Sequence, residues 1–427
     1  MSEVIERPKG TYIRRTTCRF CGGSHLTKIL DFGNFPLAGG FLTKETIADE
    51  KYYPLTLNLC QDCFLVQISD VIPAEVLFNK NYFFFSSAIG TLVEHFKLFA
   101  GEIHERFLKD KQKPSAFELG CNDGVLLKPL AALGVRVVGI DPSTNVVNSI
   151  QDKNVTVIND FFTEKIAKEI KKKHGQFDVF LTSFSFAHID DMVDIMKGVK
   201  CLLKDDGVLV IEIYYLGTLI DEMQYDMIYH EHMSYYSLKS LNSFLRKFDM
   251  EIFDLRNIPG VRSGSVRFYS RNIGQRDEKI SPAVYTMNRC EEEKGFDTVA
   301  TYSKYAERVA ETRNQLLDLL KRLKNEGKTI IGYGASGRGT IIMNYCGIDS
   351  RYLDYVVDDA PAKQGFYTPG THVPIKSWDD IKKSKFPDYV VLFAWAFTDE
   401  VIQKRQDYLQ QGGKFIIPLP DVRVISK

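Results

Sequence analysis

One short segment concentrates proton-transfer side chains: 227-MIYHEHMSYYSL-238 holds two histidines and a glutamate within three residues. Histidine is the side chain most readily poised to exchange a proton near neutral pH, and a neighbouring carboxylate can orient it. In an extended strand, His230 and His232 would point to one face, and Tyr229 and Glu231 to the other. Three interpretations follow: a metal site, an acid/base centre, or a loop whose histidines are only hydrogen-bonded.

The position of this segment favours the acid/base interpretation. It follows GVLVIEIYY at 207–215, which has the pattern of a buried strand. In a parallel sheet, the loops after the strands gather at one edge. His188 follows another such strand, FDVFLTS at 177–183, so we expect it at the same edge. A metal would need a third ligand, and no third ligand can be read from this part of the chain.

Four of the eight cysteines form two CxxC units, CRFC and CQDC. Each unit presents two thiolates from one tight turn, and two units complete the tetrahedral sulfur shell that zinc prefers. Such a shell has no open position, so the ion would be structural. This cysteine quartet consists of Cys18, Cys21, Cys60 and Cys63.

A glycine-containing loop follows the first predicted strand of the middle region. The segment 116-AFELGCNDGVLL-127 contains Glu118-x-Gly120-x-x-x-Gly124, and Asp141 closes the next strand. This pattern resembles class I S-adenosylmethionine-dependent methyltransferases. The resemblance implies that the loop faces the methionine part of the cofactor and that Asp141 accepts from the ribose hydroxyls. The expected cofactor-binding residues are Glu118, Gly120, Asn122, Asp123, Gly124, Asp141, Pro142, Asp160 and Phe161.

The elements that must position these residues divide the chain into three predicted domains. Residues 1–75 are turn-rich and carry the cysteine quartet. Residues 76–295 alternate strand and helix patterns, which predicts a doubly wound α/β sheet ending in an antiparallel pair. The resemblance implies that this sheet is of the class I methyltransferase type. Residues 296–427 begin with a long amphipathic helix and continue as a Rossmann-like α/β unit.

In that last unit, 332-GYGASGRGTIIMNYCG-347 follows a strand and opens a helix. Its glycines expose backbone N–H groups at the start of the helix, which suits an anion such as phosphate, and Arg338 adds a charge that can pair with phosphate in bidentate fashion. A glycine turn that serves only packing is the alternative.

The order of these motifs resembles the sugar C-methyltransferases, which act on nucleotide-linked 4-keto-deoxysugars. The resemblance covers essentially the whole chain and implies that His232 is the base, assisted by Glu231, with Tyr229 and His188 near the keto sugar. An aromatic–Ser–Ser element, here 82-YFFFSS-87, would supply Tyr82. The family carries lysine where this chain has Arg338. The expected substrate-binding residues are Gly334, Ala335, Arg338, Arg262, Ser265 and Lys363.

The chain departs from that family at several positions. It has Ser183-Phe184 where asparagines are usual, Arg262-Ser263-Gly264-Ser265 for an HGGS-like element, and Ala396 in the turn near the end. The identity of the sugar is therefore open. One rival function is O- or N-methylation of a nucleotide sugar or small metabolite. Another is a regulatory or RNA-modifying protein that uses the zinc knuckles as a nucleic-acid module.

Composition weighs against the second rival. Lys+Arg and Asp+Glu are both 55 among 427 residues, so the chain lacks the positive charge that nucleic-acid or anionic-membrane binding requires. The polar N-terminal segment and the absence of a long apolar run predict no signal peptide and no membrane span, and hence a cytoplasmic protein. We expect a nucleotide-linked keto-deoxysugar as partner, no nucleic acid or membrane, and a monomer or weak dimer.

Overall fold

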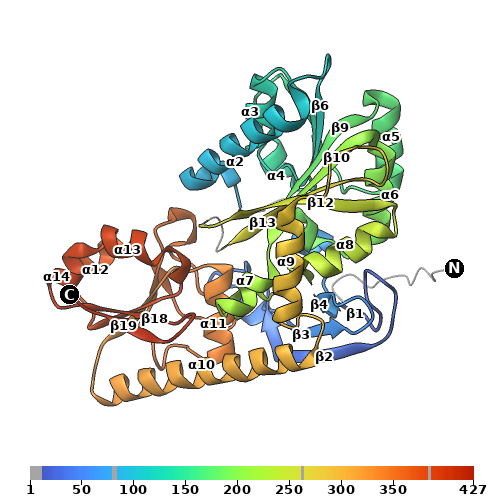
Figure 1. Ribbon diagram of the computed structural model, residues 1–427. Coiled ribbons are helices and arrows are strands. Elements are labelled where there is room, and N and C mark those ends of the chain that lie inside the picture. The colour runs from blue at the N-terminus through green and yellow to red at the C-terminus, as the bar shows by residue number, and fades with distance from the viewer. Residues whose placement is uncertain (1–11, 79–83, 261–263, 383–385) are drawn as a thin grey trace.

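The computed structural model describes residues 12–78, 84–260, 264–382 and 386–427 (Figure 1). Two predicted site residues, Tyr82 and Arg262, lie outside the described residues. The chain forms a central seven-stranded sheet, a four-stranded sheet built largely from the N-terminal region, a six-stranded C-terminal sheet and one two-stranded pair.

The central sheet confirms the predicted class I methyltransferase fold. Its strand order is β12-β13-β10-β9-β6-β7-β8, and β6 to β10 are parallel neighbours, whereas β13 is antiparallel to both β10 and β12. The expected antiparallel pair therefore stands at one edge. The strands are β6 (Ser115–Leu119), β7 (Arg136–Ile140), β8 (Val155–Ile158), β9 (Phe177–Ser183), β10 (Leu203–Tyr214), β12 (Met250–Ile258) and β13 (Ser265–Asn272).

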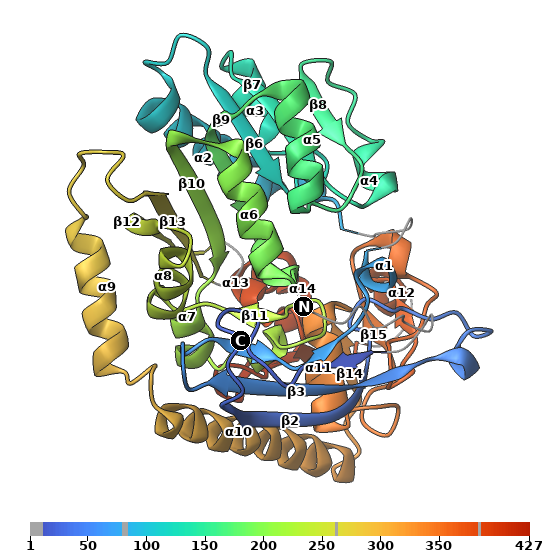
Figure 2. The same ribbon diagram turned by 90° about the vertical axis from the view of Figure 1, so that its right-hand side faces the viewer.

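Helices cover both faces of this sheet, so its strands read as continuous apolar runs. One face packs against α5, α6, α8 and α9, and the other against α2 and α3 (Figure 2). The helices are α2 (Gly90–Ile103), α3 (Leu127–Ala132), α4 (Thr144–Val147), α5 (Glu164–His174), α6 (Met192–Leu202), α8 (Leu238–Arg246) and α9 (Pro282–Glu293). α5 shows the local signals clearly: the Thr163 side chain caps its start, and Gly175 ends it at φ +74°.

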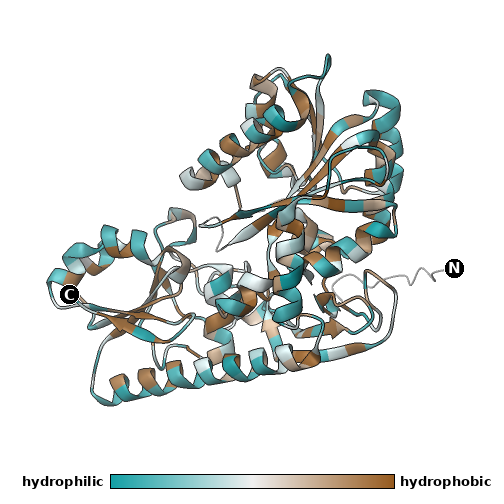
Figure 3. Cartoon of the chain, in the orientation of Figure 1, coloured by the Kyte–Doolittle hydropathy of each residue, from teal (hydrophilic) through white to brown (hydrophobic). Residues whose placement is uncertain are grey.

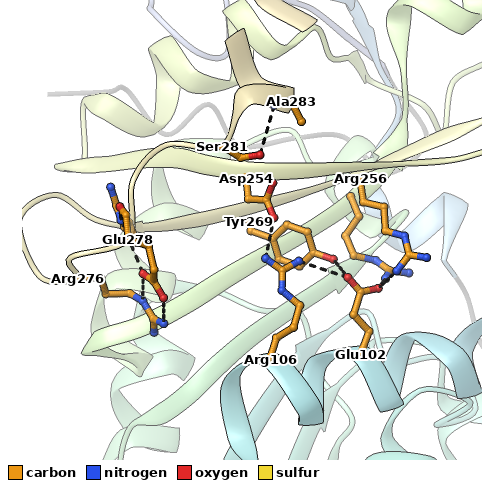
Figure 4. Close-up of polar contacts among 11 residues, drawn as sticks. Glu102, Arg106, Asp254, Arg256, Tyr269, Arg276, Glu278, Ser281 and Ala283 are labelled. Carbon is orange, nitrogen blue, oxygen red and sulfur yellow. Dashed lines mark hydrogen bonds and ion pairs between the residues drawn. The ribbon is translucent and has the colours of Figure 1, made fainter. Parts of the chain in front are cut away.

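A layer of charged side chains fastens α2 to the sheet. Glu102 of α2 accepts hydrogen bonds from Arg267 and Tyr269 of β13, and Figure 4 shows Glu102 facing Tyr269 and Arg256. Arg267 also donates to Glu212 of β10, which in turn contacts His95 of α2. Because Glu212 and Arg267 are almost fully buried, each charge depends on its partners.

The N-terminal sheet contains a strand that the sequence did not predict. Its order is β11-β4-β3-β2, with β2 (Leu26–Pro36), β3 (Tyr52–Cys60), β4 (Val66–Ile68) and β11 (Ser234–Tyr235). β11 lies within the histidine segment, two residues after His232, and pairs with β4 in antiparallel register. The N-terminal sheet and the methyltransferase sheet are thus joined at the predicted proton-transfer segment. β1 (Ile13–Arg14) and β5 (Asp70–Val71) form the two-stranded pair, and α1 (Ala74–Leu77) follows.

The C-terminal unit confirms the predicted Rossmann-like fold. Its sheet has the order β16-β15-β14-β17-β18-β19, in which only the edge strand β19 is antiparallel, so the order reverses between β14 and β17. The strands are β14 (Ile330–Tyr333), β15 (Val356–Val357), β16 (Ile375–Lys376), β17 (Tyr389–Leu392), β18 (Lys414–Ile417) and β19 (Arg423–Ile425). The helices are α11 (Gly337–Cys346), α12 (Trp378–Lys382), α13 (Thr398–Lys404) and α14 (Gln406–Gln410).

A long helix, α10 (Val299–Asn325), connects this unit to the rest and lies along β2 (Figures 1 and 2). It alternates polar and apolar colours in Figure 3, as expected for a helix with one apolar stripe. The buried residues recur every three to four positions: Tyr302, Tyr305, Val309, Thr312, Leu316, Leu320 and Leu323. None of the helices in the described ranges is both long enough and apolar enough to cross a bilayer.

Candidate active site

A cavity of about 360 Å³ opens where β6, β7 and β9 of the central sheet end. This edge is where doubly wound sheets bind ligands. Six of the nine predicted cofactor-binding residues line it: Gly120, Asn122, Asp141, Pro142, Asp160 and Phe161. Glu118, Asp123 and Gly124 stand in or beside the same loop without lining the cavity. Phe78 and Phe84 line it as well, and the sequence analysis had not assigned either of them.

The turn after β6 requires glycine at its first position. Gly120 adopts φ +73°, and a Cβ atom there would lie 2.0 Å from Ser185 Oγ. Gly120 therefore meets two constraints at once, a left-handed backbone and a close neighbour. Asn122, at φ +49°, donates its backbone N–H to Asp141 Oδ2 at 3.0 Å, which joins the first loop to the second strand end.

Three carboxylates cluster in this loop region. Burial raises the pKa of Glu118 well above its usual range, and the charges of Asp141 and Asp123 add to that effect. Burial also raises the pKa of Asp141, although Ser143 and Asn122 donate backbone hydrogen bonds to it. Glu118 Oε2 and Asp123 Oδ1 are buried without a hydrogen-bond partner. A positively charged ligand would relieve both, so the residues present fit a cationic cofactor such as S-adenosylmethionine.

The loop also holds the end of the predicted aromatic–Ser–Ser element. Asn122 Nδ2 donates to the Phe84 carbonyl at 3.0 Å, and its Oδ1 accepts from Ser86 N at 2.9 Å. Asp123 accepts from Ser87 N at 3.0 Å. The described part of this element, residues 84–87, therefore lies against the cofactor loop.

Three of the predicted catalytic residues lie together beside the cavity. The ring centroids of His188 and His232 are 5.0 Å apart, and those of Tyr229 and His232 are 4.0 Å apart. His188 lines the cavity itself, and Met233, the residue after His232, lines it too. Tyr214, at the end of β10, stands 5.2 Å from the His232 ring, and the sequence analysis had not assigned it. The only sequence signal for Tyr214 was its place at a strand end.

Residues 229–232 form a turn, not the extended strand in which His230 and His232 would share a face. His232 N donates to the Tyr229 carbonyl at 2.8 Å. The His230 ring instead contacts the Pro54 carbonyl of β3 at 3.0 Å. The two histidines therefore do not share a face. In the described part of the chain, the cysteine quartet is the only group of three or more His, Cys, Asp or Glu side chains close enough to hold a metal ion.

Backbone carbonyls assign the histidine tautomers. His232 Nδ1 lies 2.8 Å from the Met227 carbonyl, and His188 Nδ1 lies 2.6 Å from the Glu231 carbonyl. A carbonyl only accepts, so each Nδ1 carries the proton and each neutral ring has Nε2 as its basic nitrogen. His232 can then act as a base through Nε2. His188 can donate through Nε2 only when its ring is protonated.

Glu231 completes this group from the other side of the turn. Burial raises its pKa from 4.5 to about 7. A Cβ atom on Gly39, in the N-terminal region, would stand 3.7 Å from Glu231 Oε1. In addition, Thr340 of α11 donates to the Ala38 carbonyl at 3.1 Å. The 38–39 segment therefore lies between Glu231 and the start of α11, and all three predicted domains meet here.

The cysteine quartet has the geometry of a tetrahedral metal site. All four Sγ atoms lie within 4.8 Å of one another, and Cys18–Cys63 and Cys21–Cys60 are 3.5 Å apart. Four sulfurs at about 2.3 Å from a tetrahedral zinc ion would be about 3.8 Å apart. The contact between Cys18 and Cys63 lowers the pKa of Cys18 to about 4 and raises the pKa of Cys63, because the two thiols share one hydrogen bond. The donor set therefore fits zinc.

Arg19, inside the first CxxC unit, connects the quartet to the histidine segment. Its side chain is buried and donates from Nη1 to the Met233 and Ile68 carbonyls, both at 2.8 Å. Nε donates to Asp190, two residues after His188, at 3.3 Å. Sequence reasoning treated Arg19 only as a spacer between two cysteines, because nothing local indicates its distant partners.

The predicted substrate-binding residues of the C-terminal unit lie around the start of α11. Ser336 caps this helix by accepting from Gly339 N. Arg338 Nε and Nη2 donate to Asp226 at 2.8 and 3.0 Å. Lys363 donates to the Ala335 carbonyl at 2.8 Å. Gly334 adopts φ +96°, and a Cβ atom there would lie 2.7 Å from Ala394 Cβ. Ser265, at the start of β13, is buried with an unpartnered Oγ.

Family models match three successive parts of the chain. A zinc-binding domain matches residues 18–78, a methyltransferase domain matches 93–255, and a C-methyltransferase C-terminal domain matches 260–420.

Relatives of two kinds are found. C-methyltransferase NovU of Streptomyces niveus is 33% identical over 411 residues, which cover 96% of each chain. A ubiquinone biosynthesis O-methyltransferase of Actinobacillus pleuropneumoniae is 31% identical over 102 residues, 22% of this chain and 42% of that protein. Among solved structures, a SAM-dependent methyltransferase from Anabaena variabilis aligns with 14% identity and a TM-score of 0.32 over 41% of this chain and 82% of that chain.

Proposed function

The chain belongs to the C-methyltransferase family, and from this premise we propose that it methylates a carbon next to the ketone of a nucleotide-linked 4-keto-deoxysugar. The methyl donor is S-adenosylmethionine, and the cysteine quartet holds a structural zinc ion. One observation supports the proposal most: two histidines with basic Nε2 atoms, at 5.0 Å between ring centroids, stand beside the cavity that the cofactor loop forms.

The proposed reaction begins with proton removal. The ketone acidifies the proton on the adjacent carbon, and His232 Nε2 accepts it, leaving an enolate. Tyr229 donates a hydrogen bond to the developing oxyanion, and a protonated His188 adds a second, which stabilises charge as it grows in the transition state. When bound, S-adenosylmethionine supplies an electrophilic methyl group to the carbon of the enolate. Glu231, once ionised, stabilises the protonated His232.

The cavity residues hold the reactants in place. Asp141 and the turn at Gly120 orient the cofactor, and Glu118 with Asp123 provides negative charge toward its cationic end. Such positioning turns a bimolecular methyl transfer into an effectively unimolecular one. In this proposal, Lys363 and the start of α11, which the 38–39 segment separates from Glu231, hold the nucleotide.

The test is isotope exchange. The enzyme is incubated in deuterated water with a nucleotide-linked 4-keto-deoxysugar and S-adenosylhomocysteine, and NMR follows deuterium at the carbon next to the ketone. We expect exchange by the native chain and its loss in His232→Asn. The matched control is His230→Gln, which retains an N–H donor for the Pro54 carbonyl and should retain exchange. If the native chain exchanges no proton, or His232→Asn exchanges as fast, the enolate mechanism is wrong.

Product analysis separates carbon from oxygen methylation. With S-adenosylmethionine present, the proposal requires a new methyl signal coupled to the sugar carbon skeleton. A methyl signal in the range of an O–CH3 group would establish the rival O-methyltransferase function instead.

A further inference from the structure

Asp226 is a buried carboxylate to which neither the sequence motifs nor the proposed reaction assigns a role. It lies in the short η5 helix (Tyr225–Met227), six residues before His232, and is 0% exposed. Three donors reach it: Arg338 Nε at 2.8 Å, Arg338 Nη2 at 3.0 Å and Trp395 Nε1 at 2.7 Å. All three come from the C-terminal unit, more than 100 residues away in sequence.

The two donor side chains also support each other. The Arg338 guanidinium lies 4.7 Å from the centre of the Trp395 ring, a cation–π arrangement. Arg338 begins α11, and Trp395 lies in the turn after β17. Asp226 therefore accepts hydrogen bonds from the two segments that follow β14 and β17. The strand order of the C-terminal sheet reverses between these two strands.

The residue after Asp226 connects these hydrogen bonds to His232, the predicted base. Met227, the next residue, uses its carbonyl to accept from His232 Nδ1 at 2.8 Å and from the Tyr235 hydroxyl at 3.3 Å. That carbonyl fixes the tautomer of His232 and hence which nitrogen is basic. A shift of Asp226 would move the carbonyl and loosen the ring that it orients.

We propose that Asp226, held by Arg338 and Trp395, is a positioning residue for His232, and that this contact joins the C-terminal unit to the proton-transfer centre. The inference rests on the proposed function for what His232 does, but not for how it is held. It also gives Arg338 a role different from the phosphate ligand that its sequence context predicts. The Arg338 guanidinium forms two hydrogen bonds with the carboxylate of Asp226, which is fully buried. Bidentate pairing of this kind is a strong, directional contact.

The two roles of Arg338 predict different kinetics. In the positioning role, Asp226→Asn and Arg338→Met each lower kcat at least tenfold, while KM for the nucleotide sugar changes by less than about twofold. The double variant should be little worse than either single one, because both changes break the same contact. Arg338→Lys keeps the charge without the fork, and we expect an intermediate kcat. In the phosphate role, Arg338→Met raises KM strongly and Asp226→Asn leaves kcat unchanged, which would overturn the proposal.

A matched control and a milder variant guard against misfolding. Arg351 forms an exposed pair with Asp349 in the same unit, so Arg351→Met should leave kcat and KM unchanged. Trp395→Phe removes only one of the three donors to Asp226. We expect a smaller fall in kcat in the same direction, with the thermal unfolding midpoint measured in parallel.

NMR of the histidine ring tests the inference without any substrate. In the native chain labelled with ¹⁵N-histidine, His232 should show the tautomer with the proton on Nδ1. In Asp226→Asn, we expect a mixture of tautomers for this ring. If the His232 signals are the same in both proteins, Asp226 does not position the ring. If they differ but no 4-keto sugar exchanges its proton, the proposed function fails while this inference stands.

Discussion

Two arginines bind the same carboxylate from very different environments. Arg267 Nη1 lies 2.6 Å from Glu102 Oε2, and Arg256 Nη1 lies 2.8 Å from the same atom. The Arg267 side chain is 2% exposed and also donates to Glu212, whereas the Arg256 side chain is 60% exposed. We predict that the two contribute very differently to stability despite nearly equal bond lengths.

The expected magnitudes follow from burial. Arg267→Met keeps most of the side-chain volume but leaves Glu212, which is 0% exposed, without its guanidinium. Breaking a buried pair on one side costs about 3–5 kcal/mol, because a buried charge is left uncompensated. An exposed pair contributes about 0–1 kcal/mol. His95 Nε2 lies 2.6 Å from Glu212 Oε1, and this remaining hydrogen bond places the expected loss near the lower figure.

Urea unfolding followed by circular dichroism measures the difference between Arg267→Met and the control Arg256→Met. Since a chain of several units need not unfold in one step, hydrogen exchange of α2 and β10 localises the effect. Arg267→Met should lose most of its protection there, and Arg256→Met almost none. Equal losses in the two variants would refute the argument that burial decides the contribution.

The stability difference between the native chain and Arg267→Met should depend on pH. Burial opposes the shift, but the pKa of both Glu102 and Glu212 is lowered, first by hydrogen bonds from Tyr269 and His95, respectively, and then by the nearby arginines. A carboxylate with a lowered pKa contributes stability above its ordinary pKa, and this contribution is lost as the pH falls through the folded value. The stability gap between native chain and Arg267→Met should therefore narrow in acid, where protonated carboxyls no longer need a counter-charge.

Three further predictions follow. Gly120→Ala, whose Cβ would lie 2.0 Å from Ser185 Oγ, should weaken S-adenosylhomocysteine binding at least tenfold as measured by calorimetry. Gly134→Ala, at a similar φ of +81° but with no atom within 4 Å of its Cβ, should leave binding unchanged, and equal effects of the two variants would point to backbone strain alone. Because the pKa of Glu231 is raised to about 7, the rate of proton exchange at the sugar carbon should increase as the pH rises through 7, and the stability of the protein should decrease as the pH rises from 4.5 to 7. Both trends should vanish in Glu231→Gln, and an unchanged pH profile in that variant would contradict them. Removing zinc with a chelator should lower the unfolding midpoint and expose the β4–β11 amides to exchange; protection that survives would show that the quartet does not support the histidine segment.

Local patterns in the sequence predicted most of the fold. Apolar runs bounded by turns identified all five parallel strands of the central sheet and the antiparallel pair after them. The long amphipathic helix α10 was equally readable from its apolar stripe. These features depend on residues close in sequence, so a single chain suffices to find them. The family models and NovU confirm the family that the motifs indicated.

The sequence by itself therefore predicted most of the secondary structure, the glycine-containing loop after β6 and the cysteine quartet. Tertiary structure alone decided which way His230 and His232 point, because the chain turns between Tyr229 and His232 and the His230 ring contacts the Pro54 carbonyl of β3. It also decided that Arg338 meets Asp226, 112 residues away, and that Arg19 meets Met233, 214 residues away. Such contacts leave no local pattern, because a buried charge takes whichever partner the packing of three units brings to it.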